Sequence, residues 1–199
     1  MIIDVVGQRV LATPARCGTY TSESAARKLN YICVRPGLHR MIVPTEFELF
    51  DRYIQVRDPY TRLESIYHYL HDPQNYSQWG AKFARNMDFT EFLVWLANFK
   101  LERASVAWVS GILTTLRSPD LWLLSLKENA DLLEDSYGHV DAVRMDRGEV
   151  AKWFGLELGH KHKRRNVGMS VWTGYNRRIA NDALGAREDC AWFGYDVRR

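Results

Sequence analysis

The segment from residue 53 to residue 70 constrains the fold of this chain most strongly. It opens with an apolar run at residues 53–56 that is typical of a buried β-strand. Arg57 ends the run, and Asp58 and Pro59 then supply an N-cap and a proline at the first position of a helix. The helix that follows has one apolar face at helical spacing, made of Leu63, Ile66, Tyr67 and Leu70. The segment therefore predicts a strand that turns sharply into a helix.

The rest of the chain repeats this alternation. Apolar runs of strand length also occur at residues 9–13, 31–34 and 140–145. Helices are expected over about residues 21–29, 88–98, 101–116, 128–137, 148–154 and 173–184. The polar stretch 71–85 predicts a long loop. Alternating strands and helices imply an α/β fold with a parallel sheet and helices on both faces, and 199 residues suit a single domain spanning residues 1–199.

Composition excludes several classes of protein. A net charge of +3 with a pI near 8.8 is too mild for a generic nucleic-acid coat but suits a local anion pocket. The three cysteines are far apart and odd in number, which argues against a disulfide framework or structural metal. No apolar run reaches membrane-spanning length and no signal peptide is evident. We therefore expect a soluble, cytoplasmic protein with no nucleic-acid or membrane partner.

A first candidate anion site lies at residues 13–21, between a predicted strand and a predicted helix. Unpaired backbone N–H groups and the positive end of the helix dipole meet at such a junction. Gly18 permits close approach of the backbone, while Thr19 and Thr21 add hydroxyl donors. Arg16 adds a guanidinium group. The lysine of a Walker A loop is missing, which weakens a nucleotide-kinase interpretation. A plain strand–helix turn is the alternative.

A second candidate anion site pairs Arg57 with Ser65. Arg57 is expected at the carboxyl end of its strand, and Ser65 follows eight residues later, two turns into the helix. A guanidinium and a hydroxyl placed in this way can converge on one phosphate, at the sheet edge where ligands of α/β proteins bind. The alternative is a local ion pair between Arg57 and Asp58.

Together these elements resemble the sulfotransferases that use 3′-phosphoadenosine-5′-phosphosulfate (PAPS). Three blocks carry the resemblance, at about residues 14–30, 53–70 and 189–195, and the last block, which ends in Phe-Gly-Tyr, is similar to the ending of carbohydrate and heparan sulfotransferases. The resemblance implies a three-layer, P-loop-like fold, PAPS as donor, 3′-phosphoadenosine-5′-phosphate (PAP) as product, and no metal. It implies that the 5′-phosphosulfate is bound by Arg16, Cys17, Gly18, Thr19, Tyr20 and Thr21.

The same resemblance implies roles for residues further along the chain. Arg57 and Ser65 would hold the 3′-phosphate. The basic run 160–166 falls where these enzymes have a cofactor-covering segment, and Arg164 and Arg165 are its preferred ligands, although such a run can equally be a solvated face. The aromatic residues of the ending, Trp192, Phe193 and Tyr195, are expected to pack in the core. The acceptor implied is a carbohydrate hydroxyl or amine, and the short chain fits a compact bacterial or phage member.

The catalytic base is open at this point. Arg16 would stabilise the leaving phosphate oxygens. His39 lies between the two anion sites, in the region where related enzymes carry a histidine base, and an ordinary histidine titrates in a suitable range. Glu23 on the first helix is the second candidate and Glu46 the third. A nucleotide kinase and a catalytically inactive PAP-binding module are the competing functions.

Overall fold

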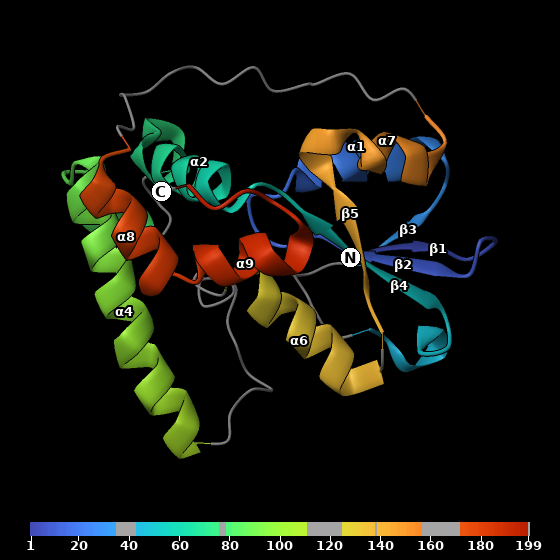
Figure 1. Cartoon of the computed structure of the whole chain (residues 1–199). Helices are drawn as coiled ribbons and strands as arrows, with labels where there is room; N and C mark the ends of the chain where they lie inside the picture. Colours follow the sequence, from blue (N-terminus) through green and yellow to red (C-terminus); the bar gives the residue numbers. More distant parts are fainter. Residues whose placement is uncertain (35–42, 76–78, 111–124, 138, 157–171, 199) are drawn as a thin grey trace. The chain divides into compact units, whose positions relative to one another are not determined.

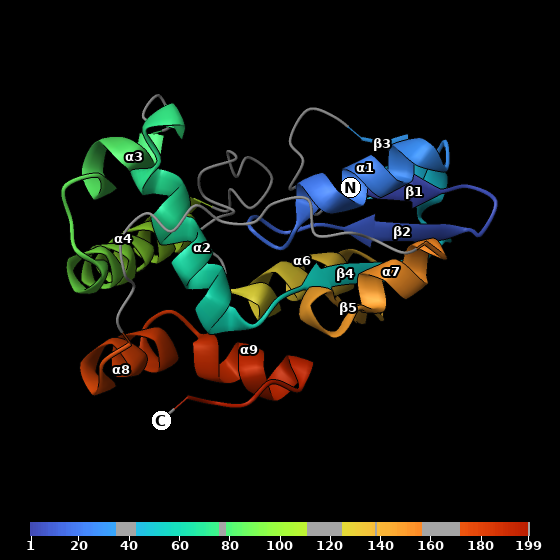
Figure 2. The same ribbon diagram turned by 90° about the horizontal axis from the view of Figure 1, so that it is seen from above.

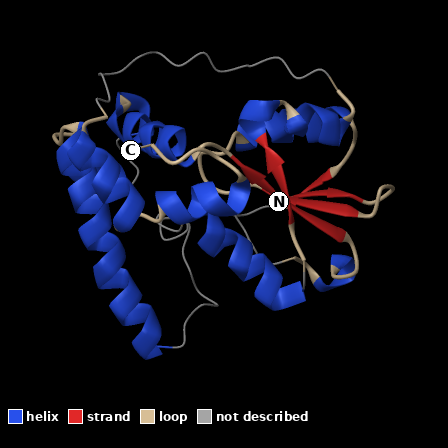
Figure 3. Ribbon diagram, in the orientation of Figure 1, coloured by secondary structure: helices blue, strands red, loops and turns tan. Residues whose placement is uncertain are grey.

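The computed structural model describes residues 1–34, 43–75, 79–110, 125–137, 139–156 and 172–198. The chain forms an α/β fold with a five-stranded mixed sheet. By contact it divides into two compact units. The first comprises Met1–Asp58 with Leu126–Arg164, and the second Pro59–Ser125 with Arg165–Arg199. The strands in the described part of the chain all belong to the first unit, whereas the described elements of the second are helical (Figure 3). A single domain over residues 1–199 stays a prediction.

The sheet has the strand order β3-β1-β2-β4-β5. These strands are β1 (Ile2–Asp4), β2 (Arg9–Ala12), β3 (Ile32–Cys33), β4 (Asp51–Val56) and β5 (Asp141–Arg144). Strands β2, β4 and β5 are parallel, with Ala12 opposite Ile54 and Val56 opposite Arg144. Strand β1 is antiparallel to both of its neighbours. The carboxyl ends of β2, β4 and β5 therefore lie at one edge of the sheet, as the candidate site requires.

The expectation of a wholly parallel sheet is wrong for β1. Residues 2–12 form a hairpin in which Ile2 pairs with Leu11 and Asp4 with Arg9. Gln8 closes the hairpin with a positive φ of 51°. The hairpin was not recognised because β1 is only three residues long, too short to show the alternation that marks a strand. The parallel part of the sheet is consequently confined to three strands.

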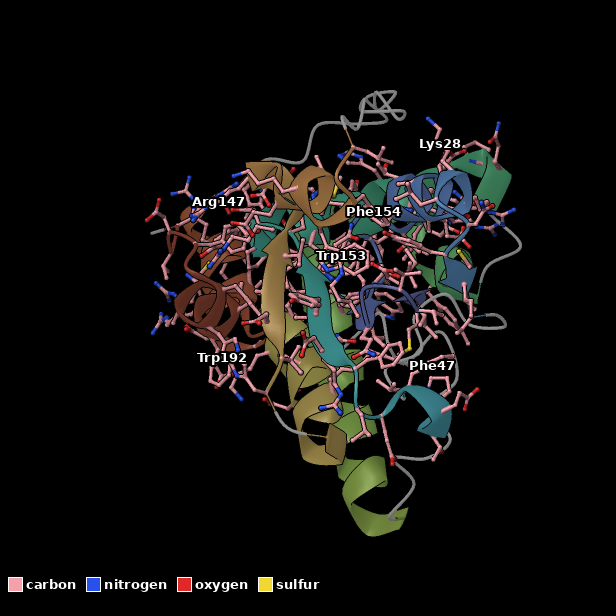
Figure 4. The ribbon with its side chains drawn as sticks, turned by 90° about the vertical axis from the view of Figure 1, so that its right-hand side faces the viewer. Lys28, Phe47, Arg147, Trp153, Phe154 and Trp192 are labelled. Carbon is pink, nitrogen blue, oxygen red and sulfur yellow. The ribbon has the colours of Figure 1, made fainter. Side chains whose placement is uncertain are left out.

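Helices cover both faces of the sheet within the first unit. Helices α1 (Thr19–Lys28) and α7 (Glu149–Phe154) lie over one face and α6 (Leu126–Tyr137) lies on the other (Figure 1). Short 3₁₀ helices precede β4 and follow β5: η1 (Thr45–Phe47) and η4 (Met145–Arg147). The core under α1 and α7 includes Trp153 and Phe154, which lie among packed side chains in Figure 4, where Lys28 points outward.

The second unit packs around α2. Its described elements are α2 (Pro59–His71), η2 (Pro73–Asn75), α3 (Trp79–Ala84), α4 (Phe89–Ser110), α8 (Gly174–Asp182) and α9 (Ala186–Phe193). Helix α2 contacts α3 and α9, and α8 contacts α4 and α9 (Figure 2). The predicted apolar face of α2 is buried in this core. Helix α2 begins at Pro59, as its sequence signal predicts.

Three expectations about this unit are wrong. The stretch 71–85 is not one long loop, because η2 and α3 occupy much of it and α3 buries Ala81 and Ala84 in the core. The helices expected at 88–98 and 101–116 are one continuous helix through residue 110, since neither glycine nor proline separates them. Trp192 is 51% exposed rather than core, because α9 buries the face that carries Asp189, Cys190 and Phe193.

Candidate functional site

The loop that follows β2 is the centre of the candidate site. After Ala12 the chain makes a tight turn in which the Cys17 N–H donates to the Pro14 carbonyl oxygen at 3.2 Å. Arg16, the third residue of this turn, has a φ of +66°. Arginine rarely adopts this left-handed conformation, and such residues tend to be retained at functional sites. Helix α1 begins at Thr19, directly after Gly18, so the predicted strand–turn–helix junction is confirmed.

Gly18 is required here by both its conformation and its surroundings. Its φ is +88°, in the left-handed region that favours glycine. A Cβ atom at this position would lie 2.5 Å from Sδ of Met145, which follows the carboxyl end of β5. The Met145 side chain therefore packs closely on Gly18, and the close approach of an anion to the Gly18 backbone stays a prediction.

The amino terminus of α1 presents hydrogen-bond donors that have no partner among the described residues. In the described part of the chain, the N–H groups of Gly18 and Thr19 make no hydrogen bond, whereas those of Thr21 and Ser22 donate to the Gly18 carbonyl oxygen. Thr19 is only 6% exposed, and its buried hydroxyl oxygen also lacks a partner among the described residues. A left-handed residue followed by a helical one turns successive N–H groups toward one point, which suits an anion.

Arg57 lies beside this loop, as predicted. It follows the last residue of β4 and is half-buried, and its Nη1 atom lies 3.5 Å from the Arg16 carbonyl oxygen. The parallel pairing of β2 with β4 explains the proximity, because the two strands end at the same edge. The structure thus brings Arg57 and the loop 13–18 together.

The other residues predicted to bind the 5′-phosphosulfate differ in how far their side chains are exposed. The Cys17 side chain is fully buried, and its N–H and carbonyl groups bond to Pro14 and Gln55, so Cys17 offers no donor to a ligand. Tyr20 is 61% exposed. Thr21 is half-buried and lines a cavity of about 100 Å³ together with Gln55, Met145 and Asp146. A cavity of this size accommodates a few water molecules or one small anion, so it is not by itself a nucleotide pocket.

Several predicted site residues are not placed at this loop. Ser65 is buried on α2 in the second unit, and its convergence with Arg57 stays a prediction. His39, Arg164 and Arg165 lie outside the described residues. Glu46 is exposed in η1, which precedes β4 and so lies at the opposite edge of the sheet from the loop.

Glu23, the second candidate base, is buried on α1. The Met1 amino group is its electrostatic neighbour. Burial lowers the pKa of the Met1 amino group to about 6, while Cys33 and Glu23 act in the opposite direction. A nearby amino group gives the Glu23 carboxylate a local structural partner, which weakens its case as a base that faces a substrate.

Two residues that line the site were missed by sequence reasoning. Gln55 is a fully buried polar residue of β4, and Met145 packs on Gly18. The polarity of Gln55 within an apolar strand was the available signal, because a buried amide needs partners. Nothing local marks Met145, since its contact with Gly18 joins residues far apart in the chain.

The described residues contain no group of three or more histidine, cysteine, aspartate or glutamate side chains placed to hold a metal ion. Of the helices in the described ranges, none combines the length and apolarity that a membrane crossing requires. Comparisons of the chain with protein-family models, with curated proteins and with solved structures found no match. The candidate function therefore rests on the geometry and chemistry of this site.

Proposed function

We propose that this protein is a PAPS-dependent sulfotransferase with a three-layer, P-loop-like arrangement around its parallel strands. The observation that carries the proposal is a set of donors at the start of α1 with no partner among the described residues: the N–H groups of Gly18 and Thr19 and the buried Thr19 hydroxyl. The position of Arg57 beside the same loop supports it further. Donors of this kind, with a guanidinium nearby, suit a dianionic ligand.

The proposal assigns the two ends of the donor nucleotide to two groups of residues. The 5′-phosphosulfate would lie at residues 16–21, on the N–H groups at the start of α1. The 3′-phosphate would be held by Arg57 and Ser65, with Arg164 and Arg165 covering the cofactor. The lack of a Walker lysine favours PAPS over a magnesium nucleotide triphosphate.

The reaction is an in-line displacement at sulfur. The acceptor hydroxyl or amine attacks the sulfur atom and loses its proton to a base, while the bond between sulfur and the bridging phosphate oxygen breaks. Negative charge then grows on the 5′-phosphate of PAP. The N–H groups of Gly18 and Thr19 and the guanidinium of Arg16 would stabilise that charge. The chemistry needs no metal.

His39 is the proposed base, with Glu23 as the second candidate. We expect His39→Ala to reduce turnover of sulfate transfer while leaving PAP affinity nearly unchanged, because a base acts on the acceptor and not on the nucleotide. Steady-state kinetics and calorimetry measure the two quantities separately. Undiminished turnover would shift the role to Glu23, which Glu23→Gln tests. A carbohydrate is the proposed acceptor class.

Calorimetry with PAP and with magnesium–ATP tests the proposed function. We expect PAP to bind and Arg57→Ala to weaken binding by about 1.5–3 kcal/mol, the usual value of a charge-assisted hydrogen bond. Arg27→Ala is the matched control, since it removes the same charge from an exposed position in the last turn of α1. Tight binding of magnesium–ATP with indifference to PAP would contradict the proposal, as would an Arg57→Ala variant with unchanged PAP affinity.

A further inference from the structure

Gln55 is a polar side chain completely enclosed in the first unit. It lies on β4, has no exposed surface, and forms two hydrogen bonds. Its Nε2 group donates to the Cys17 carbonyl oxygen, and its Oε1 atom accepts from the Ser22 hydroxyl at 2.5 Å. A carbonyl oxygen can only accept, so the amide orientation is fixed by chemistry. Gln55 thereby ties β4 both to the loop and to the first turn of α1.

This bond determines which way the peptide group between Cys17 and Gly18 faces. In a planar trans peptide the C=O and N–H bonds point in opposite directions. Because the Cys17 carbonyl points at Gln55, the Gly18 N–H points away from β4. Rotation of this peptide by half a turn would present the carbonyl oxygen in place of the N–H, and an anion would then meet a negative dipole instead of a donor.

Arg57 acts on the neighbouring peptide in the same way. Its Nη1 atom faces the Arg16 carbonyl oxygen, one residue before the carbonyl that Gln55 holds. Gln55 lies in β4 and Arg57 follows its last residue, so both donors to the loop come from the carboxyl end of this strand and the residue after it. Two successive loop carbonyls are therefore directed toward β4.

We propose that Gln55 is a positioning residue that locks the loop in its anion-binding orientation, with the Gly18 N–H presented to the ligand. The inference rests on the proposed function, because it concerns how the same loop binds the 5′-phosphate. Glycine has more backbone conformational freedom than any other residue, so the peptide between Cys17 and Gly18 would rotate most easily without a hydrogen bond to hold it. The Ser22 hydroxyl donates to the Oε1 atom of Gln55 and so holds the amide in this orientation.

Gln55→Glu tests the lock with almost no change of shape. An ionised carboxylate cannot donate to the Cys17 carbonyl, whereas a protonated carboxyl group can. We expect PAP affinity relative to wild type to fall about tenfold as the pH is raised from 6 to 9, and to recover as it is lowered. Measuring the ratio to wild type at each pH removes the titration of PAP itself. Because an ionised carboxylate buried here would also lower the free energy of unfolding, unfolding is measured at each pH, and a positioning role requires PAP affinity to fall while the variant remains folded.

Gln55→Leu is the second variant, because it removes both hydrogen bonds at every pH. Asp4→Asn is the matched control, since Asp4 is another buried polar residue of the first unit but lies at the opposite end of β2. We expect Gln55→Leu to bind PAP at least tenfold more weakly and Asp4→Asn to bind it as wild type does. If both Gln55 variants bind PAP within twofold of wild type across the pH range, Gln55 does not position the loop, and the proposed function is unaffected. If wild type itself fails to bind PAP, the proposed function falls and the lock falls with it.

Discussion

The two ends of β2 carry polar clusters that differ in one respect. At the amino end, Arg9 and Gly7 both donate to the buried carboxylate of Asp4: the Arg9 Nη2 atom lies 2.5 Å from Oδ2, and the Gly7 N–H lies 2.9 Å from Oδ1. At the carboxyl end, the N–H groups of Gly18 and Thr19 and the Thr19 hydroxyl have no partner in the described part of the chain. The carboxylate at the amino end therefore has hydrogen-bond partners within the protein. The donors at the carboxyl end, which we call the open cluster, have none among the described residues.

The difference distinguishes a structural cluster from a binding cluster. Burial alone would disfavour the charged form of Asp4, yet the Gly7 N–H and the Arg9 guanidinium outweigh it and hold its pKa below the ordinary value. A buried donor or acceptor without a partner destabilises the fold by about 1–3 kcal/mol. A buried hydroxyl without a partner in the described part of the chain, at the start of α1, is understandable if a bound ligand supplies the missing hydrogen bond. The comparison therefore makes opposite predictions for the two ends of β2: substitutions at the amino end should change stability and not PAP affinity, and loss of a donor at the carboxyl end should weaken PAP binding.

Gly18→Ala should have the largest effect. The added methyl group places alanine in the left-handed region, at about 1–2 kcal/mol, and forces it against Met145, at about 1–3 kcal/mol more. We expect the free energy of unfolding to fall by about 2–5 kcal/mol, measured by urea denaturation, and PAP binding to be lost.

Gly155→Ala is the control for that substitution. Gly155 also has a positive φ, of 65°, but a Cβ atom there meets no atom of the described residues within 4 Å. It should therefore lose only the backbone contribution of about 1–2 kcal/mol and keep its PAP affinity. Equal losses of stability in the two variants would show that the contact between Gly18 and Met145 is unimportant.

Asp4→Asn should affect stability alone. We expect a loss of about 1.5–3 kcal/mol at pH 7, because a charge-assisted pair with Arg9 is weakened, and unchanged PAP affinity. Since the folded-state pKa of Asp4 is lowered, its contribution is full above the ordinary pKa near 4 and is lost as the pH falls. The stability difference between wild type and variant, followed by denaturation from pH 7 to pH 2, should therefore shrink. A constant difference, or weakened PAP binding, would contradict the structural role.

Local signals in the sequence predicted the parts of the fold that depend on neighbouring residues. The strand at residues 53–56, the helix start at Pro59 and the junction at Gly18 each follow from a short apolar run, a cap or a turn residue. The β1–β2 hairpin was missed because β1 has only three residues, too few for a strand pattern. The exposure of Trp192 was missed because the burial of one face of α9 is set by tertiary packing.

Long-range contacts explain what was missed at the site. The bond between Gln55 and Cys17 joins residues 38 positions apart, and no periodicity relates them. Whether a donor is open is likewise a property of the folded chain, because it depends on every group that surrounds it. The sequence placed the start of this helix at about residue 21, and only the structure shows that it begins at Thr19 and that the Thr19 hydroxyl is buried without a partner among the described residues.

Thr19→Val should have the smallest effect on stability, and it tests most directly whether the open cluster is an anion site. Valine has nearly the shape of threonine but lacks the hydroxyl. We expect the free energy of unfolding to rise by about 1 kcal/mol, because an unpaired buried oxygen is removed, and PAP to bind about five- to tenfold more weakly, because a donor to the phosphate is lost. Thr19→Ser, which keeps the hydroxyl, should retain PAP affinity. Unfolding and calorimetry on the same preparations therefore give the decisive measurement: higher stability with weaker PAP binding is the predicted result, and lower stability with unchanged PAP binding would contradict it.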